Sequence, residues 1–412
     1  MIPLRTIMAS HAASLGLPPW LLPLTWETWR THEQGVAWHQ LLSASTHVEP
    51  GGAAHPFSPD LPVHVFLAVC DHYEPEWGHA DHSTAWERVS RWVTEYPRLL
   101  AEVHDVRGRP PQHTFFFPQD QYHPAYLELL HQLVIQGWGD VEVHLHHDRD
   151  TAEGLREKLQ DFVHTLYAHH GLLRRDTRGQ IAYGFIHGNW ALANCRPDGR
   201  WCGVAHELSV LRQTGCYADF TFPSAPDVTQ PTWMNGVVYA RDAAHGRGWQ
   251  TVHVAEVGRP APSDALLLIS GPLLWDLRRR KAGVLPRLEN GDVLASHPWH
   301  IRRLPLWMQA RIQVRGRPNW WFIKLHTHGC KPANLHMWLS SATRDFHHAL
   351  AQIHRHQPWF RYYYVTAWEM AQLIHAAEHG ESDPLAVLSG SSFAGSTSSP
   401  LVSSSVGSSQ QT

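Results

Sequence analysis

From Val63 onward, the chain alternates short apolar runs with longer segments whose apolar residues recur at helical spacing. The first run, Val63–Cys70, is rich in valine and holds a single polar residue, His64. Such a run is typical of a strand that is buried on both faces of a parallel sheet. Because strands that alternate with helices form βαβ units, this part of the chain is predicted to be an α/β domain with a parallel sheet or barrel.

The same patterns place the other elements. Further strands are predicted at His113–Phe117, Val141–Leu145, Ile181–His187, Trp233–Ala240, Gln250–Glu256, Ala265–Leu268 and Trp320–Leu325. Helices are predicted at Thr25–Leu42, Ser83–Val103, Pro124–Gly137, Thr151–His169, Asn334–His356 and Thr366–Glu378. Pro97 is expected to kink the second of these helices or to divide it in two.

Composition divides the chain into three parts. Residues 1–62 form an N-terminal extension with one predicted helix and a loop rich in Gly, Pro and His. Residues 63–385 hold the alternating elements and form the predicted catalytic domain. Residues 386–412 consist largely of Ser, Gly, Thr and Gln. Such a segment cannot bury enough apolar surface to fold, so a disordered tail is expected.

Charge and hydropathy exclude several classes of partner. The chain has 34 Lys and Arg against 37 Asp and Glu. This near balance gives no electrostatic reason to bind nucleic acid or an anionic membrane. No run of about 18 apolar residues occurs, so no integral membrane segment is predicted. Prolines interrupt the N-terminal apolar stretch, which argues against a signal peptide and for a cytoplasmic protein.

Five cysteines are present, and none forms a C-x-x-C pair. A cysteine-type zinc site or a thioredoxin-like motif is therefore not expected. Reduced thiols are expected in a cytoplasmic protein. Cys195 and Cys202 flank a Pro-Asp-Gly turn, and a disulfide between them is the alternative if the protein enters an oxidising compartment.

Histidine is the most unusual residue in the composition, with 34 copies beside 20 tryptophans. Most of these histidines must be surface or packing residues, so position has to identify the functional ones. In parallel α/β proteins, functional side chains gather where strands end. The first predicted strand runs into Asp71, His72 and Tyr73. The strand that ends at Leu145 has His144 in its last turn of alternation, and His146 and Asp150 follow in the loop after it.

His144 and His146 lie two residues apart and can share one face of a strand, as metal ligands would. Two later strand ends carry the same kind of chemistry. One later strand runs into His187, Gly188, Asn189 and Trp190, and another into His326 and His328. Glycine permits close backbone approach to a ligand. Asp219, inside an aromatic-lined turn, is expected to line the same pocket or to orient a histidine.

The order of these motifs resembles that of the polysaccharide deacetylase family of metal-dependent carbohydrate esterases. The corresponding segments, within residues 63–330, are Val69–His72, Glu142–His146, His187–Trp190 and Lys324–His326. The resemblance implies a distorted (β/α) barrel of roughly seven parallel strands. The chain has one aspartate rather than two at the first motif, and Asp150 where the family has its second histidine.

The resemblance implies a metal-dependent hydrolase that removes an acyl group from a carbohydrate, such as a polysaccharide or amino sugar. The predicted ligands of a divalent ion are Asp71, His72, His144, His146 and Asp150. Because several of them are histidine nitrogens, zinc is the expected ion. The predicted catalytic residues are Asp71, His187 and His326, the last as proton donor to the leaving group. The predicted substrate-binding residues are Tyr73, Asn189, Trp190, Asp219, Trp233 and His328. Asp71, His146 and His326 are expected to face one cavity.

Two alternatives stay open from the sequence. The first is a glycosidase on a related barrel, with Asp71 and Asp219 as its two carboxylates. The second is a catalytically inactive carbohydrate-binding protein of a polysaccharide pathway. Metal content separates the hydrolase from both, and carboxylate spacing tests the glycosidase.

Overall fold

The computed structural model describes residues 4–33, 60–281 and 285–390. Its helices are α1 (Leu4–Ser14), α2 (Leu21–Glu33), α4 (His82–Leu100), α5 (Pro124–Ile135), α6 (Ala152–His164), α7 (Glu207–Gln213), α8 (Leu304–Gln309), α9 (Pro332–Trp338), α10 (Ser341–His356), α11 (Ala367–Glu378) and α12 (Pro384–Gly390). Its strands are β1 (Val63–His72), β2 (His113–Pro118), β3 (Gly139–Leu145), β4 (Arg174–Arg175), β5 (Ile181–His187), β6 (Cys216–Asp219), β7 (Val237–Asp242), β8 (Trp249–Val254), β9 (Leu266–Ile269), β10 (Leu274–Lys281), β11 (Leu285–Glu289), β12 (Trp320–Thr327) and β13 (Phe360–Tyr364).

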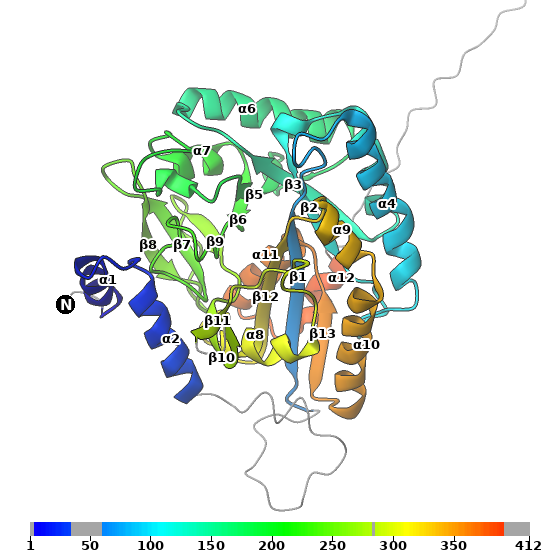
Figure 1. Ribbon diagram of the computed structural model, residues 1–412. Helices are drawn as coiled ribbons and strands as arrows, with labels where there is room; N and C mark the ends of the chain where they lie inside the picture. Colours follow the sequence, from blue (N-terminus) through cyan, green and yellow to red (C-terminus); the bar gives the residue numbers. More distant parts are fainter. Residues whose placement is uncertain (1–3, 34–59, 282–284, 391–412) are drawn as a thin grey trace, which may run out of the picture.

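Eleven strands form one mixed sheet in the order β12-β1-β2-β3-β5-β6-β9-β7-β8, with β13 paired to β1 and β4 paired to β5. The strands from β12 to β9 are parallel, whereas β7 and β8 are antiparallel additions at one end. The predicted α/β class with a mostly parallel sheet is confirmed. The pairing of strands does not close into a ring, and the sheet is curved (Figure 1).

Strand β1 pairs with three other strands of the sheet. It pairs with β12 along its length on one side. On the other side it pairs with β13 over Val63–Leu67 and then with β2 over Cys70–His72. Every residue of β1 is buried, which explains its nearly continuous apolar sequence.

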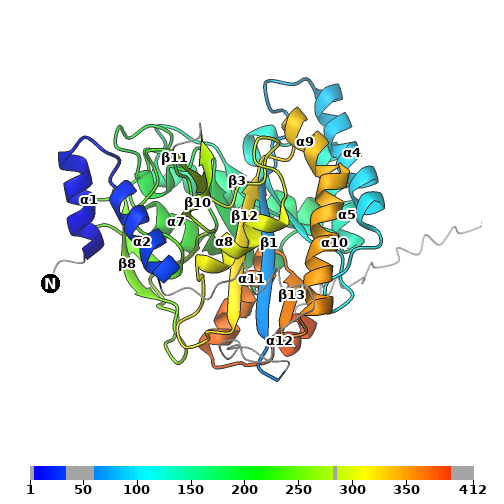
Figure 2. The same cartoon turned by 60° about the horizontal axis from the view of Figure 1, so that its bottom comes forward.

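The two faces of the sheet enclose two hydrophobic cores. Alternate residues of β1 divide between them, with Val69 in the core beneath the outer helices and Cys70 in the core on the concave face. The outer core includes buried residues of α4, α5, α6, α7 and α10, and Figure 2 shows α4, α5 and α10 side by side outside β1 and β13. Helix α11 packs into the concave core. The side-chain period of a strand therefore decides which face each residue reaches.

Local sequence explains the main helices. Asp81 caps α4 by accepting a hydrogen bond from the Thr84 main chain, and Trp92 lies on its buried stripe. Pro97 does not divide α4, because it lies in the last turn and only one main-chain hydrogen bond is lost. Thr366 and Glu369 form a capping box at the start of α11.

The predicted helix Asn334–His356 is two helices, α9 and α10, which meet near Ser340. Strands β6, β10, β11 and β13 were not predicted, because each is short or polar enough to lack a clear pattern. The predicted helix Thr25–Leu42 corresponds to α2, which begins earlier, at Leu21, and is described as far as Glu33. Its remainder and the tail beyond residue 390 lie outside the described residues.

Helices α1 and α2 pack together at one side of the molecule, with α2 beside β10 (Figure 1). Trp20 and Leu24 pack there against Met234 and Leu273 in a small third core. Among the described helices, none combines the length and the apolar character that crossing a bilayer requires. All five cysteines are free thiols, so Cys195 and Cys202 are not bonded to each other.

Candidate functional site

Three strands of the sheet end in a pair of polar side chains two residues apart. Because alternate residues share a face of a strand, each pair projects to the same side. We call the six residues the strand-end cluster: His72 and Glu74 from β1, His144 and His146 from β3, and His326 and His328 from β12.

The rings of the strand-end cluster are in mutual contact. The His72 ring centroid lies 4.8 Å from that of His144, 4.6 Å from that of His328 and 6.5 Å from that of His326. The His144 and His146 rings are 4.7 Å apart. Strands β1 and β3 are separated by β2, so these rings meet because the sheet curves and they lie on its concave side.

Glu74 joins the histidines. Its Oε1 lies 3.2 Å from His146 Nε2, and its Oε2 accepts a hydrogen bond from His328 Nδ1 at 3.0 Å. The other ring nitrogen of His146 is 3.0 Å from Asp120 Oδ1, in the turn after β2. A carboxylate that fixes the remote nitrogen of a histidine orients the near nitrogen for a ligand.

His144 has the arrangement of a metal-ligating histidine. Its Nδ1 donates to the Ile186 main-chain carbonyl at 2.9 Å, which leaves Nε2 with the lone pair. That Nε2 is buried and has no hydrogen-bond partner, and neither has His72 Nε2. One ligand atom each from Glu74, His144 and His146 lies within 4.8 Å of the other two.

Burial and charge set the protonation of the cluster. Burial lowers the pKa of His144 to about 3 and holds those of His72 and His326 well below the ordinary value. Burial acts against the charge on His146, but hydrogen bonds to Asp120 and Glu74 raise its pKa to about 9. Burial opposes the Glu74 charge too, yet its two histidine partners hold its pKa well below the usual range. His72, His144 and His326 are thus neutral and Glu74 is ionised, the forms that bind metal, whereas His146 would have to release a proton to become a ligand.

One side of the cluster reaches solvent. The side chains of His146 and Asp120 are 25% and 45% exposed, respectively. Trp77 is 39% exposed, and its ring centroid is 5.9 Å from that of His328. Trp190, half-buried after β5, lies 6.0 Å from the His72 ring. Two indole rings thus lie beside the histidines, and Lys331 Nζ lies 3.5 Å from the centroid of the Trp77 ring.

Asp71 does not belong to the cluster. It lies one residue out of phase with His72, on the outer face of β1. Its Oδ2 is 2.8 Å from His113 Nε2, and its Oδ1 accepts from the Gly329 main chain at 2.7 Å. The carboxylate is completely buried, so its environment is that of a packed structural group. The expectation that Asp71, His146 and His326 face one cavity therefore has to be revised.

The other predicted residues are distributed over several places. His187 faces the outer side of the sheet, and Asp150 lies 3.4 Å from His147 rather than in the cluster. Tyr73 is fully buried against Phe115 and Trp92. The remaining predicted residues are Asn189, Asp219 and Trp233.

Asp219 is buried, and both its oxygens accept hydrogen bonds from Thr221. Burial raises its pKa to about 7. Asn189 and Trp233 are half-buried, the latter beside Gly236. With Asp71 and Asp219 each enclosed by donors, no observation favours the two-carboxylate glycosidase built on them.

Sequence reasoning missed Glu74, Asp120 and Trp77. The signal for Glu74 was the spacing His72-x-Glu74, which repeats the H-x-H spacing of the other two strand ends. The choice of Asp71 ignored that a carboxylate one residue away from His72 must point to the opposite face.

Gly188 lies directly against the His146 ring of the strand-end cluster. A Cβ at this position would lie 2.3 Å from His146 Cδ2 and 2.7 Å from the Leu145 carbonyl oxygen. The close approach predicted for this glycine is therefore made by the His146 ring.

We expect Gly188→Ala to displace the His146 ring and to weaken metal binding about 10–100-fold, as loss of an orienting contact does. Isothermal titration with zinc measures the change. In a His146→Ala background, the added alanine should cost less stability, because the ring is gone and only the Leu145 carbonyl is crowded. An equal cost in both backgrounds would show that the ring is not what the glycine accommodates.

A further acidic group, Glu289, Asp292 and His297, has ligand atoms within 4.8 Å of one another. Arg303 already occupies it, with Nε and a terminal nitrogen 2.9 and 2.8 Å from the two Glu289 oxygens. Trp307 Nε1 donates to the same carboxylate at 3.1 Å. A buried guanidinium in this position excludes a cation, so the group is an ion-pair network.

No protein-family model matches the chain, and no curated protein matches its sequence. Among solved structures, the chain is similar to an alpha-mannosidase from Enterococcus faecalis V583, with 10% sequence identity and a TM-score of 0.38. The match covers 76% of this chain and 29% of that protein. Function therefore has to be inferred from the side chains of the strand-end cluster.

Proposed function

We propose that the protein is a metal-dependent hydrolase, with a divalent ion held by Glu74, His144 and His146. The observation that carries the proposal is the buried Nε2 of His144, which has no hydrogen-bond partner, in a residue that has a ligand atom within 4.8 Å of those of Glu74 and His146. An unpaired buried polar atom is costly unless something binds it. A ligand set of two imidazoles and one carboxylate is typical of catalytic zinc sites that keep one position open.

Each residue around the three ligands has a defined task. A bound ion would polarise a substrate carbonyl and acidify a water. Asp120 fixes the orientation of His146 through Nδ1, and His328 holds Glu74 from the opposite side. His326, which is neutral because burial lowers its pKa, can accept a proton from the attacking water and return it to the leaving group.

We propose a carbohydrate as the substrate and an acyl group as the part removed. Trp77 and Trp190 support this, because flat indole faces beside the reacting centre suit the apolar faces of a sugar ring. In such a reaction, water adds to the acyl carbon, the bond to the sugar nitrogen or oxygen breaks, and that atom takes up a proton. The resemblance of the strand-end motifs to polysaccharide deacetylases agrees with this chemistry.

The test combines metal removal with a substrate panel. Purified protein is dialysed against a chelator, and release of acetate from N-acetylated and O-acetylated sugars is measured before and after zinc is restored. We expect hydrolysis to be lost with the metal and recovered with it. Deacylation that continues in the metal-free protein would contradict the proposal, and so would cleavage of aryl glycosides as the sole activity. Sugar binding without any turnover would instead favour the inactive carbohydrate-binding protein.

We expect His326→Gln to lower kcat by about 10²–10⁴-fold while the metal content stays the same, because the variant removes a proton carrier and not a ligand. The main chain of His326 is held by Gly291 and Val293, so the strand should persist. Elemental analysis and a pH profile of kcat check both parts. Loss of metal from this variant would instead make His326 a ligand.

A further inference from the structure

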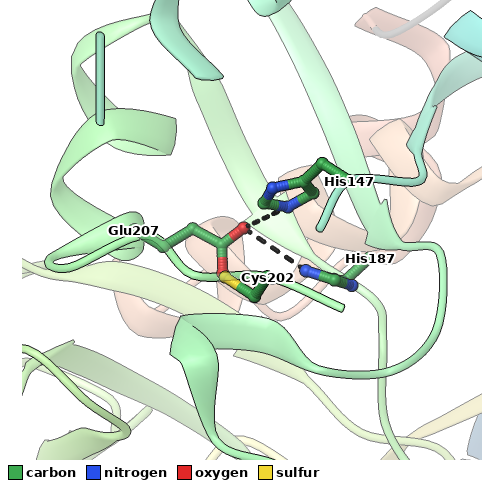
Figure 3. Close-up of side chains that lie close together, drawn as sticks. All are labelled: His147, His187, Cys202 and Glu207. Atoms are coloured by element: carbon green, nitrogen blue, oxygen red, sulfur yellow. Dashed lines mark hydrogen bonds and ion pairs between the residues drawn. The ribbon is translucent and has the colours of Figure 1, made fainter. Parts of the chain in front are cut away.

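A second group of metal-binding side chains lies on the outer face of the sheet, apart from the strand-end cluster. We call it the buried His–Cys–Glu cluster: His147, His187, Cys202 and Glu207. All four residues are buried, and one ligand atom from each lies within 4.8 Å of the other three. Figure 3 shows their side chains pointing toward one another.

Four separate segments supply these residues. His147 follows β3, His187 ends β5, Cys202 lies in the loop after β5, and Glu207 begins α7. His187 is the partner of Leu145 in the β3–β5 pairing and therefore shares the outer face with it. His147 lies two residues after Leu145 and projects to this face, whereas His144 and His146 project to the other.

Glu207 is the centre of the group. Its Oε1 is 3.0 Å from His147 Nε2 and 3.6 Å from His187 Nε2, and its Oε2 is 3.5 Å from Cys202 Sγ. Ligands of a tetrahedral zinc ion, bound at ~2.0–2.3 Å, lie about 3.3–3.8 Å apart. The side chains are thus already spaced nearly as a bound ion requires.

The unpaired ring nitrogens of His187 are an independent indication that this cluster binds a ligand. Neither of its ring nitrogens has a hydrogen-bond partner, and the residue is completely buried. Burying an imidazole with both nitrogens unpaired costs free energy that folding has to offset. An ion on Nε2 removes most of that cost.

From this geometry we propose that the buried His–Cys–Glu cluster is a structural zinc site. Two imidazoles, a thiolate and a carboxylate match the ligands of zinc, whereas magnesium and calcium prefer oxygen. The charges of thiolate, carboxylate and Zn²⁺ sum to zero, which suits a site without solvent. Four protein ligands leave no open position, so the ion supports structure and not turnover.

The surroundings fit that role. Asp150 Oδ2 lies 3.4 Å from His147 Nδ1 and is itself held by Lys158 at 2.7 Å, which places a carboxylate behind a ligating histidine. The site ties the irregular loop 188–206 to β3 and α7. That loop leads from Trp190, which lies beside His72, so the proposed ion also steadies a wall of the strand-end cluster.

Cobalt distinguishes the two sites, because Cys202 contributes sulfur here and the strand-end cluster has none. Full-length protein is loaded with Co²⁺, and its near-ultraviolet spectrum is recorded. We expect a thiolate-to-cobalt charge-transfer band, and two metal ions per chain by elemental analysis. Glu74→Gln should keep the band and lose one ion, whereas Cys202→Ala should lose the band and the other ion.

Cys195→Ser is the matched control. Cys195 is half-buried in the same loop, with its Sγ near the Trp190 and Thr229 carbonyls, and should leave band and stoichiometry unchanged. If Cys202→Ala fails to fold, the wild-type cobalt spectrum still decides. A wild-type protein without the thiolate band would overturn the proposal, and so would a Cys202→Ala protein that binds as much metal as wild type. Neither result bears on hydrolysis at the strand-end cluster.

Discussion

Glu74→Gln should remove the metal from the strand-end cluster and, with it, the hydrolytic activity. The variant keeps the shape of Glu74 but takes away the charged ligand that lies between His146 and His328. Loss of an inner ligand should weaken zinc binding by more than about 100-fold, since even outer partners are worth 10–100-fold. The rate should fall about 10³-fold or more, because a bound ion stabilises the transition state by several kcal/mol. Zinc titration and acetate release measure the two effects.

Asp71→Asn is the control for this experiment. Asp71 is the carboxylate nearest to Glu74 in the predicted motif, but it bonds His113 and the Gly329 main chain on the outer face. Its replacement should cost about 1–3 kcal/mol of stability, because a buried donor loses its acceptor, and should leave the metal content unchanged. If Asp71→Asn lost the metal and Glu74→Gln kept it, the assignment of ligands would be wrong.

Arg303→Ala should lower the free energy of unfolding by about 3–5 kcal/mol, as removal of one partner from a buried ion pair does. Arg303 is 2% exposed and binds both oxygens of Glu289, together with the His297 main-chain carbonyl. Without it, the buried Glu289 carboxylate keeps Trp307 and the Gly291 main chain as donors but loses its guanidinium counter-charge, and only His297, 3.7 Å away, stays near it. Urea unfolding followed by tryptophan fluorescence gives the size of the effect.

Changing both partners provides the comparison. Arg303→Met combined with Glu289→Gln removes both charges, so this double variant should be more stable than Arg303→Ala alone. A loss below about 1 kcal/mol for Arg303→Ala would mean that Glu289, Asp292 and His297 do not depend on the guanidinium.

The class of the fold was predictable from the sequence, because buried parallel strands are apolar on both faces and amphipathic helices repeat between them. Ile181–His187 was predicted with the observed bounds. β13, Phe360–Tyr364, was missed because its aromatic residues follow a helix closely and carry no alternation. Its place beside β1 depends on pairing across nearly the whole domain, which no local pattern contains.

Part of the strand-end cluster could be anticipated from the sequence. The H-x-H spacing at two strand ends singled out His144, His146, His326 and His328, whose rings the structure brings together around His72, and their roles stay predictions. At the first strand the prediction chose Asp71, whereas the structure places Glu74 among the histidines, because a strand that is apolar on both faces hides which residues point inward. His187 was expected near the reacting centre, yet it lies on the opposite face with Cys202, which the absence of a C-x-x-C motif had set aside.

The pairing of β1 with β12 and β13 also constrains when the protein can fold during synthesis. Both edges of β1 are completed by segments near the end of the described chain, so the contact order of this sheet is high and its assembly is slow. The strand-end cluster cannot exist on the ribosome until Trp320–Thr327 has emerged. The buried His–Cys–Glu cluster draws all four residues from the segment between His147 and Glu207. An ion captured there by the nascent chain would organise β3, β5 and α7 early, and the last strands would dock onto a half that is already ordered.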